Sequence, residues 1–344
     1  MNQEWRQYLA KRKAPLRKGN ATAFAEEGTR SAIYDITHLG LLYVAGRDSD
    51  TFLQGQTTCD ISILTEQRSS PGAVCNPKGR VVTTFTILKT ADAGYLLLLP
   101  AELLEPVRQR LQRYVLRADV KLANISDQWC IIGLSGRQLA PILAEQNIEL
   151  PDEPQTVAGQ TDWISIRVPS ADERFLVLAS MARAVTLWEQ LADKKQLSEH
   201  DSGLWMCHEI ADGIPVITQA TSEAFVPQMI NLDLLGGISF DKGCYTGQEV
   251  VARMHYLGQL KRRMVLGAGT SGRTPNAGDP VFDAKAAAEQ RVGTIVMAAR
   301  CTPDQYHFLA VLQTASAESG DLRIGAPDGE PLTLRPLPYR LQTQ

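Results

Sequence analysis

The stretch "SFDKGCYTGQEVVARMHYLG", residues 239–258, holds one cysteine in a glycine-rich turn directly before a helical pattern. The positive charge of Lys242 and the N-terminal end of the helix both favour a thiolate at Cys244. Gly243 removes bulk, so a partner could approach the sulfur closely. The alternative is that Cys244 is a small apolar side chain packed under the turn, as most free cysteines are. The residues by themselves favour neither interpretation.

The helix after this turn has start and stop signals of its own. Thr246-Gly247-Gln248-Glu249 matches the capping box S/T-x-x-E, which predicts a helix start at Thr246 and a structural role for Glu249. The spacing of Val250, Met254 and Leu257 predicts one buried face. Gly258 then predicts the end of the helix.

A papain-like Cys/His nucleophile is the enzymatic alternative that a lone cysteine raises. His255 is eleven residues beyond Cys244 and off the predicted buried face, and the adjacent side chains of Cys207 and His208 point apart in regular structure. The sequence also contains no P-loop and no G-x-S-x-G motif. A hydrolase therefore has no support beyond the cysteine.

Length and composition describe an ordinary globular protein. The 344 residues predict two or three domains. The net charge of −3 argues against binding to a phosphate backbone in bulk, and no apolar run reaches the roughly 18 residues that span a bilayer. Residues 1–20 are basic without an apolar h-region, so they predict a short amphipathic helix and not a secretory signal.

The six cysteines are scattered singly, without a C-x-x-C pair or zinc-finger spacing. In a chain of this size that usage is typical of free thiols in a reducing compartment. We therefore expect six free thiols and a cytoplasmic location.

The order of patterns along the chain predicts an α+β protein. Residues 40–46, 80–90 and 94–100 read as strands, the last two as a hairpin, and 101–116 reads as a helix with Leu104, Val107, Leu111, Tyr114 and Val115 inward. A second mixed unit opens at residue 129. After Arg263 short strand-like runs separated by Gly, Pro and Asp predict a small all-β domain. The predicted domains are 1–128, 129–260 and 261–344.

The motif "KGCYTGQE" (242–249) resembles the signature of the YgfZ family, folate-binding-fold proteins tied to iron–sulfur enzymes. Residues 211–263 read like that family almost throughout, and "LQGQTTCDI" (53–61) and "CNPKGRVV" (75–82) resemble its N-terminal landmarks. The family is in turn similar to the T-protein of the glycine cleavage system. The resemblance implies two ferredoxin-like α+β units around a central folate channel and a C-terminal β-barrel.

The resemblance also implies the site. Cys244 would be the working thiol and Lys242 its electrostatic activator. The residues that would shape the turn or face the cofactor are Gly243, Tyr245, Gly247, Gln248, Arg253 and Asp212. The implied cofactor is tetrahydrofolate, bound with micromolar affinity, on the order of −8 kcal/mol. We expect no metal to be bound by this chain alone, because clusters usually need four protein ligands.

Two positions depart from the T-protein pattern. Thr83 and Thr84 stand where T-proteins carry an aspartate that positions the transferred group, and a hydroxyl cannot replace a carboxylate in acid–base work. Alignment on "GIP" places Ala211 where many relatives carry a pterin-anchoring glutamate, with Glu209 and Asp212 out of register. Aminomethyl transfer is thereby disfavoured.

The function that follows is assistance to iron–sulfur cluster assembly or repair, with any link to tRNA modification passing through a client enzyme. Expected partners are client enzymes or cluster carriers and a folate, without nucleic acid or membrane, and the chain is expected to be monomeric. The alternatives are a tetrahydrofolate-dependent aminomethyltransferase or demethylase, and a binding protein whose cysteine is structural. A catalytic carboxylate would favour the transferase.

Overall fold

The computed structural model describes residues 2–13, 31–137, 139–194, 197–258, 260–270, 273–285 and 290–341. The predicted N-terminal helix is confirmed as α1 (Gln3–Lys13). Trp5 and Leu9 of α1 are buried in one apolar core with the first sheet. The chain folds into two compact units, and each is described by itself.

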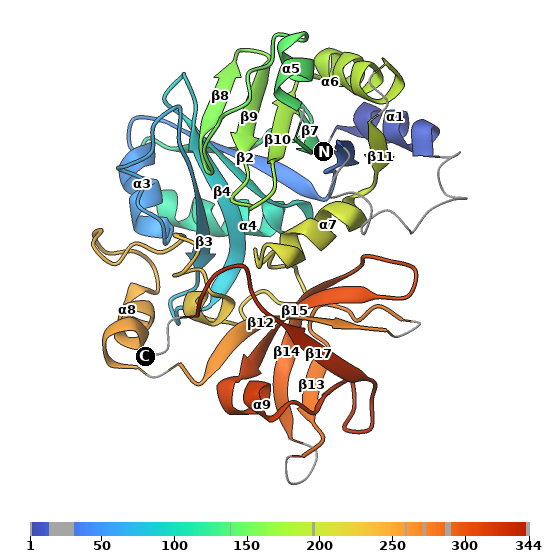
Figure 1. The fold of residues 1–344 in the computed structure, drawn as a ribbon. Helices are drawn as coiled ribbons and strands as arrows, with labels where there is room; N and C mark the ends of the chain where they lie inside the picture. The colour runs from blue at the N-terminus through green and yellow to red at the C-terminus, as the bar shows by residue number, and fades with distance from the viewer. Residues whose placement is uncertain are drawn as a thin grey trace. The chain divides into compact units, whose positions relative to one another are not determined.

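The first sheet has the strand order β11-β1-β7-β10-β9-β8 (Figure 1). Its strands are β1 (Ala32–Asp35), β7 (Cys130–Ser135), β8 (Val157–Gln160), β9 (Trp163–Arg167), β10 (Arg174–Ala179) and β11 (Ser198–His200). Only the β1–β11 pairing is parallel among the pairings described. Side chains from α5 (Leu139–Ala144) and α6 (Met181–Glu189), which continues as a π-helix over Gln190–Lys194, complete the core on this sheet.

The second sheet has the order β3-β4-β5-β2-β6. Its strands are β2 (Leu39–Ala45), β3 (Ser69–Cys75), β4 (Val81–Lys89), β5 (Tyr95–Pro100) and β6 (Lys121–Asn124). The predicted hairpin is confirmed, because β4 and β5 pair antiparallel from Thr86 opposite Leu98 to Lys89 opposite Tyr95. α3 (Ser49–Gln56) follows β2, and α4 (Ala101–Val115) follows β5.

Helix α4 corrects one predicted contact. Its buried residues are Leu103, Leu104, Val107, Leu111 and Val115. Tyr114 was expected to face inward but is 38% exposed. One residue advances about 100° around a helix, so Tyr114 lies on the flank of the apolar stripe and Leu103 completes it instead.

The C-terminal all-β prediction is confirmed by a closed barrel with the order β12-β15-β14-β13-β16-β17. Its strands are β12 (Arg262–Gly269), β13 (Pro280–Asp283), β14 (Arg291–Arg300), β15 (Tyr306–Gln313), β16 (Leu322–Ile324) and β17 (Pro331–Arg335), with α9 (Thr314–Ser319) between β15 and β16. Its apolar core includes the buried rings of Tyr306 and Phe308.

The two units are discontinuous in sequence. Unit 1 holds Met1–Ser49, Ile63–Ser70 and Thr86–Trp205, and unit 2 holds Asp50–Ser62, Pro71–Phe85 and Met206–Gln344. Residues 50–62 and 71–85 thus belong to the same compact unit as the motif segment and the barrel. The linear division into 1–128, 129–260 and 261–344 stays a prediction. Unit 2 holds every residue proposed for the site.

Candidate functional site

The loop before α8 (Gln248–Leu257) presents Cys244 to solvent. Lys242 and Tyr245 are buried at 8% and 7% exposure, whereas Gly243 and Cys244 between them are exposed. A Cβ added at Gly243 would meet no atom within 4 Å. The other free cysteines, Cys59, Cys75 and Cys130, are all buried. Two buried anchors therefore hold a short exposed dipeptide that carries the thiol.

The first anchor is the ammonium group of Lys242. Its Nζ donates to the carbonyl oxygens of Thr57 at 2.9 Å and Cys59 at 2.6 Å, and lies 5.2 Å from the ring centroid of Tyr245. Burial lowers the pKa of Lys242 to about 8, while Cys59 and Asp60 oppose that shift. Burial also raises the pKa of the Cys59 thiol, and the charge of Lys242 lowers it in part.

This arrangement bears on the role predicted for Lys242. The ammonium was expected to activate Cys244 by its charge, but the contacts described for it are with residues 57–59 and Tyr245. A lysine has three N–H donors, and two of them are already used by these carbonyl groups. Lys242 thus ties the loop to the 57–59 segment, and activation of Cys244 by its charge stays a prediction.

The second anchor is the ring of Tyr245. Burial raises the pKa of its phenol well above the ordinary value, and neighbouring Cys75 raises it further. Its hydroxyl is a buried atom with no hydrogen-bond partner among the described residues. Its predicted contact with a cofactor stays a prediction.

Two glycines join the motif to the "CNPKGR" turn. Gly247 has φ +85°, and a Cβ there would clash with the carbonyl oxygen of Asn76 and lie 2.9 Å from the Cα of Gly79. Gly79 itself has φ +68°. The Asn76 side chain builds the turn, because its Oδ1 accepts from the backbone N–H groups of Lys78 and Arg80. Segments 170 residues apart in the sequence thus meet at glycines that no larger residue could replace.

The start of α8 differs from the predicted capping box. The N-cap is Gly247, and Thr246 Oγ1 donates to Oε1 of Gln56 at 3.3 Å instead of capping the helix. Glu249 is exposed. Gly247, in left-handed conformation, takes the N-cap position, so the helix begins at Gln248, one residue later than an N-cap at Thr246 predicts.

The buried residues of α8 also differ from the predicted ones. Val251 is the fully buried residue, and its carbonyl oxygen accepts from Nε2 of Gln228 at 2.6 Å. Val250 and Met254, expected on the buried face, are only half-buried. The side chain of Leu257 lies outside the described residues. Gly258 follows the last helical residue as predicted, in extended conformation.

The remaining predicted positions on α8 are near the surface. Gln248 is half-buried and Arg253 is exposed. His255 stacks on Phe240 with ring centroids 3.7 Å apart, and Tyr256, 64% exposed, meets both rings edge-on. Sequence reasoning missed this aromatic cluster, although three rings within 17 residues of a surface loop and helix are a signal for one. His255 therefore packs on a ring, which gives the Cys/His alternative no support.

The threonines of β4 have structural partners. Thr84 Oγ1 donates to the carbonyl oxygen of Pro215 at 3.1 Å and accepts from the N–H of Ile217 at 3.2 Å. Thr83 is fully buried, and its Oγ1 donates to the carbonyl oxygen of Thr84 at 3.0 Å. Both hydroxyls hold backbone in place. Neither is a free acid–base group.

The segment with the "GIP" landmark follows α7 (Ser202–Ala211). Glu209 is buried, whereas Ala211 and Asp212 are half-buried. Gly213 has φ +66°, and its carbonyl oxygen accepts from the Tyr339 hydroxyl at 2.8 Å. The structure therefore puts no carboxylate at position 211.

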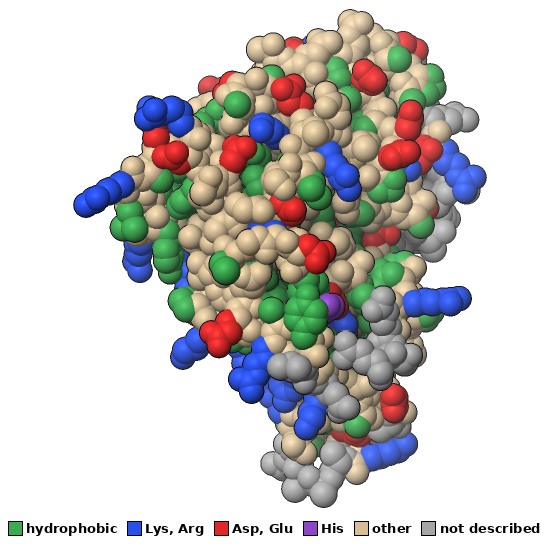
Figure 2. Space-filling model, turned by 90° about the vertical axis from the view of Figure 1, so that its left-hand side faces the viewer, with side chains coloured by type: hydrophobic (Ala, Val, Ile, Leu, Met, Phe, Trp, Pro, Cys, Tyr) green, Lys and Arg blue, Asp and Glu red, His purple; other side chains and the backbone are tan. Residues whose placement is uncertain are grey.

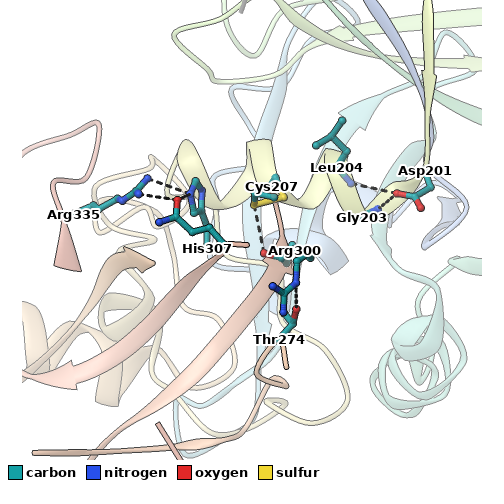
Figure 3. The surroundings of a disulfide bond; sticks show 11 residues. Asp201, Gly203, Leu204, Cys207, Thr274, Arg300, His307 and Arg335 are labelled. Carbon is teal, nitrogen blue, oxygen red and sulfur yellow. Dashed lines mark hydrogen bonds between the residues drawn. A yellow bond between two sulfur atoms is a disulfide. The ribbon is translucent and has the colours of Figure 1, made fainter. Parts of the chain in front are cut away.

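One cysteine prediction is wrong. Cys207 of α7 and Cys301, directly after β14, form a disulfide with their Cα atoms 5.6 Å apart (Figure 3). Free thiols were expected because the six cysteines are scattered singly without a pairing motif, and these two lie 94 residues apart. Only the folding of α7 onto the end of the barrel brings them together.

Metal-binding groups, membrane-spanning helices and surface charge are the remaining features that bear on function. In the ranges that the structure describes, no three His, Cys, Asp or Glu side chains group as a metal site, and no helix is long and apolar enough to cross a membrane. On the face that Figure 2 shows, acidic and basic side chains are interspersed.

Comparison with known proteins first defines the class. Residues 6–153 match the family model of the GCVT N-terminal domain. The glycine cleavage system aminomethyltransferase T from Bartonella henselae superposes with a TM-score of 0.74 over 90% of this chain and 86% of its own, at 16% identity. That identity supports the fold alone. The chain has the T-protein fold, with an exposed cysteine in its motif loop.

The comparison of sequences then gives the family. Two curated relatives named tRNA-modifying protein YgfZ come from Shigella dysenteriae serotype 1 (strain Sd197) and Escherichia coli (strain SE11). Each is 33% identical over 304 residues, which are 88% of this chain and 91% of the relative. The chain belongs to the YgfZ family.

Proposed function

We propose that this protein assists the assembly or repair of iron–sulfur clusters in client enzymes, with Cys244 as the thiol that contacts the cargo or a partner thiol. The observation that carries the proposal is the exposed Gly243-Cys244 dipeptide between the buried anchors Lys242 and Tyr245. Free cysteines are usually among the most buried residues, and the other three free cysteines of this chain follow that rule.

The local geometry supports a role in contact with a partner. Gly243 has open space where a side chain would stand, so a second molecule can approach the neighbouring sulfur. One thiol is too few to hold a cluster, which usually needs four protein ligands. A client enzyme or carrier therefore has to supply the other ligands, and the contact is transient.

The relatives' printed name gives the connection to tRNA. A tRNA-modifying role of this chain would be indirect and pass through an iron–sulfur client enzyme. The net charge of −3 supports this form of the proposal, since direct tRNA binding is favoured by a strongly basic protein. The protein would act in the cytoplasm.

Folate is the cofactor that the fold suggests, but the residues do not reproduce a pterin anchor. Ala211 offers no polar side-chain atom where a carboxylate is expected, and the hydroxyls of Thr83 and Thr84 hold backbone groups. The proposed role of Cys244 therefore includes no step through folate. The same hydroxyl contacts disfavour aminomethyl transfer, so we regard the chain as an assembly factor rather than a transferase.

The test is complementation of a strain that lacks this gene. Cys244→Ser is nearly isosteric at an exposed position, so it should fold and accumulate normally. We expect it to restore less than about a tenth of the lost activity of several iron–sulfur enzymes, on the assumption that the sulfur itself is required. Asp241→Asn is the matched control, because it changes an exposed residue of the same loop, and it should restore activity fully.

Immunoblots establish equal abundance of the two variants. Full restoration by Cys244→Ser at normal abundance would refute the proposal and leave a binding protein with an incidental cysteine.

A further inference from the structure

The disulfide between Cys207 and Cys301 joins α7 to the β-barrel within unit 2. It links Cys207 of α7 to Cys301 between β14 and β15 (Figure 3). The two residues are buried, with exposures of 0% and 3%. Cys301 is also held by its backbone, which donates to the carbonyl oxygen of Gln305 at 3.1 Å. We propose that this pair is a redox latch, which fastens the end of α7 to the barrel when oxidised and releases it when reduced.

The segment after Cys207 shows what the latch would hold. The carbonyl oxygen of Gly213 accepts from Tyr339, and the N–H of Ile214 donates to the carbonyl oxygen of Glu209 at 2.9 Å. Pro215 and Ile217 then bind the hydroxyl of Thr84. One continuous segment, 207–217, therefore runs from the disulfide to β4, where its backbone groups bond to the hydroxyl of Thr84.

A disulfide at the start of that segment limits how far it can open. Backbone amide hydrogens near a disulfide exchange with solvent more slowly, because local unfolding must proceed without separating the two bonded residues. Reduction removes this constraint and leaves the hydrogen bonds of Gly213, Pro215 and Ile217 to hold the segment. The segment contains Ala211 and Asp212, the residues at the position of the predicted folate contact.

The chemistry is thiol–disulfide exchange with a second dithiol. A dithiol reductant attacks one sulfur, the Cys207–Cys301 bond breaks, and two thiols remain while the reductant becomes a disulfide. Two electrons and two protons pass from reductant to protein. Oxidation runs the same exchange backwards with a disulfide-bearing oxidant. Because both sulfurs are buried, the reductant can reach them only after local opening.

The latch is separate from the thiol of the motif loop. The residues that anchor the Cys244 loop make their contacts at 55–59 and 76–79, not at α7. Oxidation state should therefore change the 207–217 segment while leaving the access of reagents to Cys244 as it was. This inference does not depend on the role proposed for Cys244.

The first test counts the free thiols of the full chain in its oxidised and reduced states. Oxidised protein, denatured and alkylated, should show four reactive thiols, and protein treated with dithiothreitol should show six. A peptide joined through Cys207 and Cys301 should appear only in the oxidised digest. Six thiols under every oxidising condition that leaves the protein folded would overturn the proposal.

Hydrogen exchange then tests the consequence. We expect the amides of 207–217 to exchange about tenfold faster after reduction, and those of β7 in unit 1 to be unchanged. Cys301→Ala should exchange like the reduced protein and stop responding to dithiothreitol. Equal exchange in both states would show a passive crosslink and refute the latch. Alkylation of Cys244 at equal rates in both states is the control for general unfolding.

Discussion

At the scale of single residues, the backbone geometry of the motif loop requires glycine at some positions and not at others. Gly247 and Gly79 have left-handed backbone and close neighbours, so a residue with a side chain would be strained at either position. Gly243 has neither constraint. The open space at Gly243, next to the exposed thiol, supports the proposal that a partner approaches Cys244.

The glycines give a prediction about stability. Gly247→Ala should lower the free energy of unfolding by at least about 2 kcal/mol, because it combines a left-handed alanine with a clash against Asn76. Gly243→Ala should change it by less than about 0.5 kcal/mol. Urea unfolding of both variants checks this. Equal losses would show that the turn tolerates a side chain at 247 or rejects one at 243.

Lys242 gives a prediction about pH. Its pKa is about 8 in the folded protein and about 10.4 in an unfolded chain. Between those values the unfolded state binds more protons, so this residue makes the free energy of unfolding rise with pH. The difference in unfolding free energy between wild type and Lys242→Met should therefore increase from pH 8 to 9.5.

The two proteins are compared because ionisation of buried cysteines and tyrosines makes the free energy of unfolding fall as pH rises. That contribution is present in both proteins and largely cancels in their difference. Lys78→Met, which removes an exposed lysine from the neighbouring turn, corrects for the loss of one positive charge. A difference that stays flat over this range would contradict a buried ammonium at 242.

At the scale of elements, polar side chains tie particular helices and strands of unit 2 to neighbouring segments. Gln228 holds α8 through the carbonyl oxygen of Val251, and Thr84 holds β4 to the segment after α7. Arg263 at the start of β12 makes a bidentate ion pair with Asp233, and both side chains are largely buried. Side-chain hydrogen bonds and one ion pair thus join α8, β4 and β12 to segments distant in the sequence.

The end of α4 supplies a prediction at this scale. Leu116 follows the helix with φ +47° and ψ −106°, and it is 88% exposed. Leu116→Gly should raise the free energy of unfolding by about 0.5–1 kcal/mol, because glycine accepts positive φ without strain and the leucine side chain has little packing to lose. Leu116→Ala keeps the Cβ and should bring no gain. Thermal unfolding of both variants distinguishes the two effects.

At the scale of the whole molecule, the chain has the T-protein fold, and the positions expected to carry a transferase's acid and pterin anchor hold other residues. Thr83 and Thr84 stand on β4 as structural hydroxyls, and Ala211 stands where a pterin anchor is expected. The working group we propose lies instead on the loop before α8.

Folate affinity follows from this comparison. Ala211→Glu should lower the dissociation constant of tetrahydrofolate by about tenfold, since a hydrogen bond to a charged group contributes about 1.5 kcal/mol. Ala211→Gln is the matched control of equal size without the charge, and it should gain less. Isothermal titration measures all three proteins. No heat at millimolar ligand with any of them would exclude this folate site.

The sequence by itself determined the elements and the family. Alternating and helical apolar patterns located the β4–β5 hairpin, α4 and the barrel, because side-chain burial on one face is a local property of the chain. The motif segment identified the loop that carries Cys244, since glycines such as Gly247 are demanded by backbone conformation.

Only the tertiary structure decided which distant groups meet. Lys242 reaches carbonyl groups of 57–59, Gly247 abuts the turn at Asn76, and Cys207 bonds Cys301 across 94 residues. It also moved the start of α8 past Thr246, whose hydroxyl found Gln56. Local patterns contain no information on such partners, because a side chain's contacts depend on how segments far apart in the chain pack together.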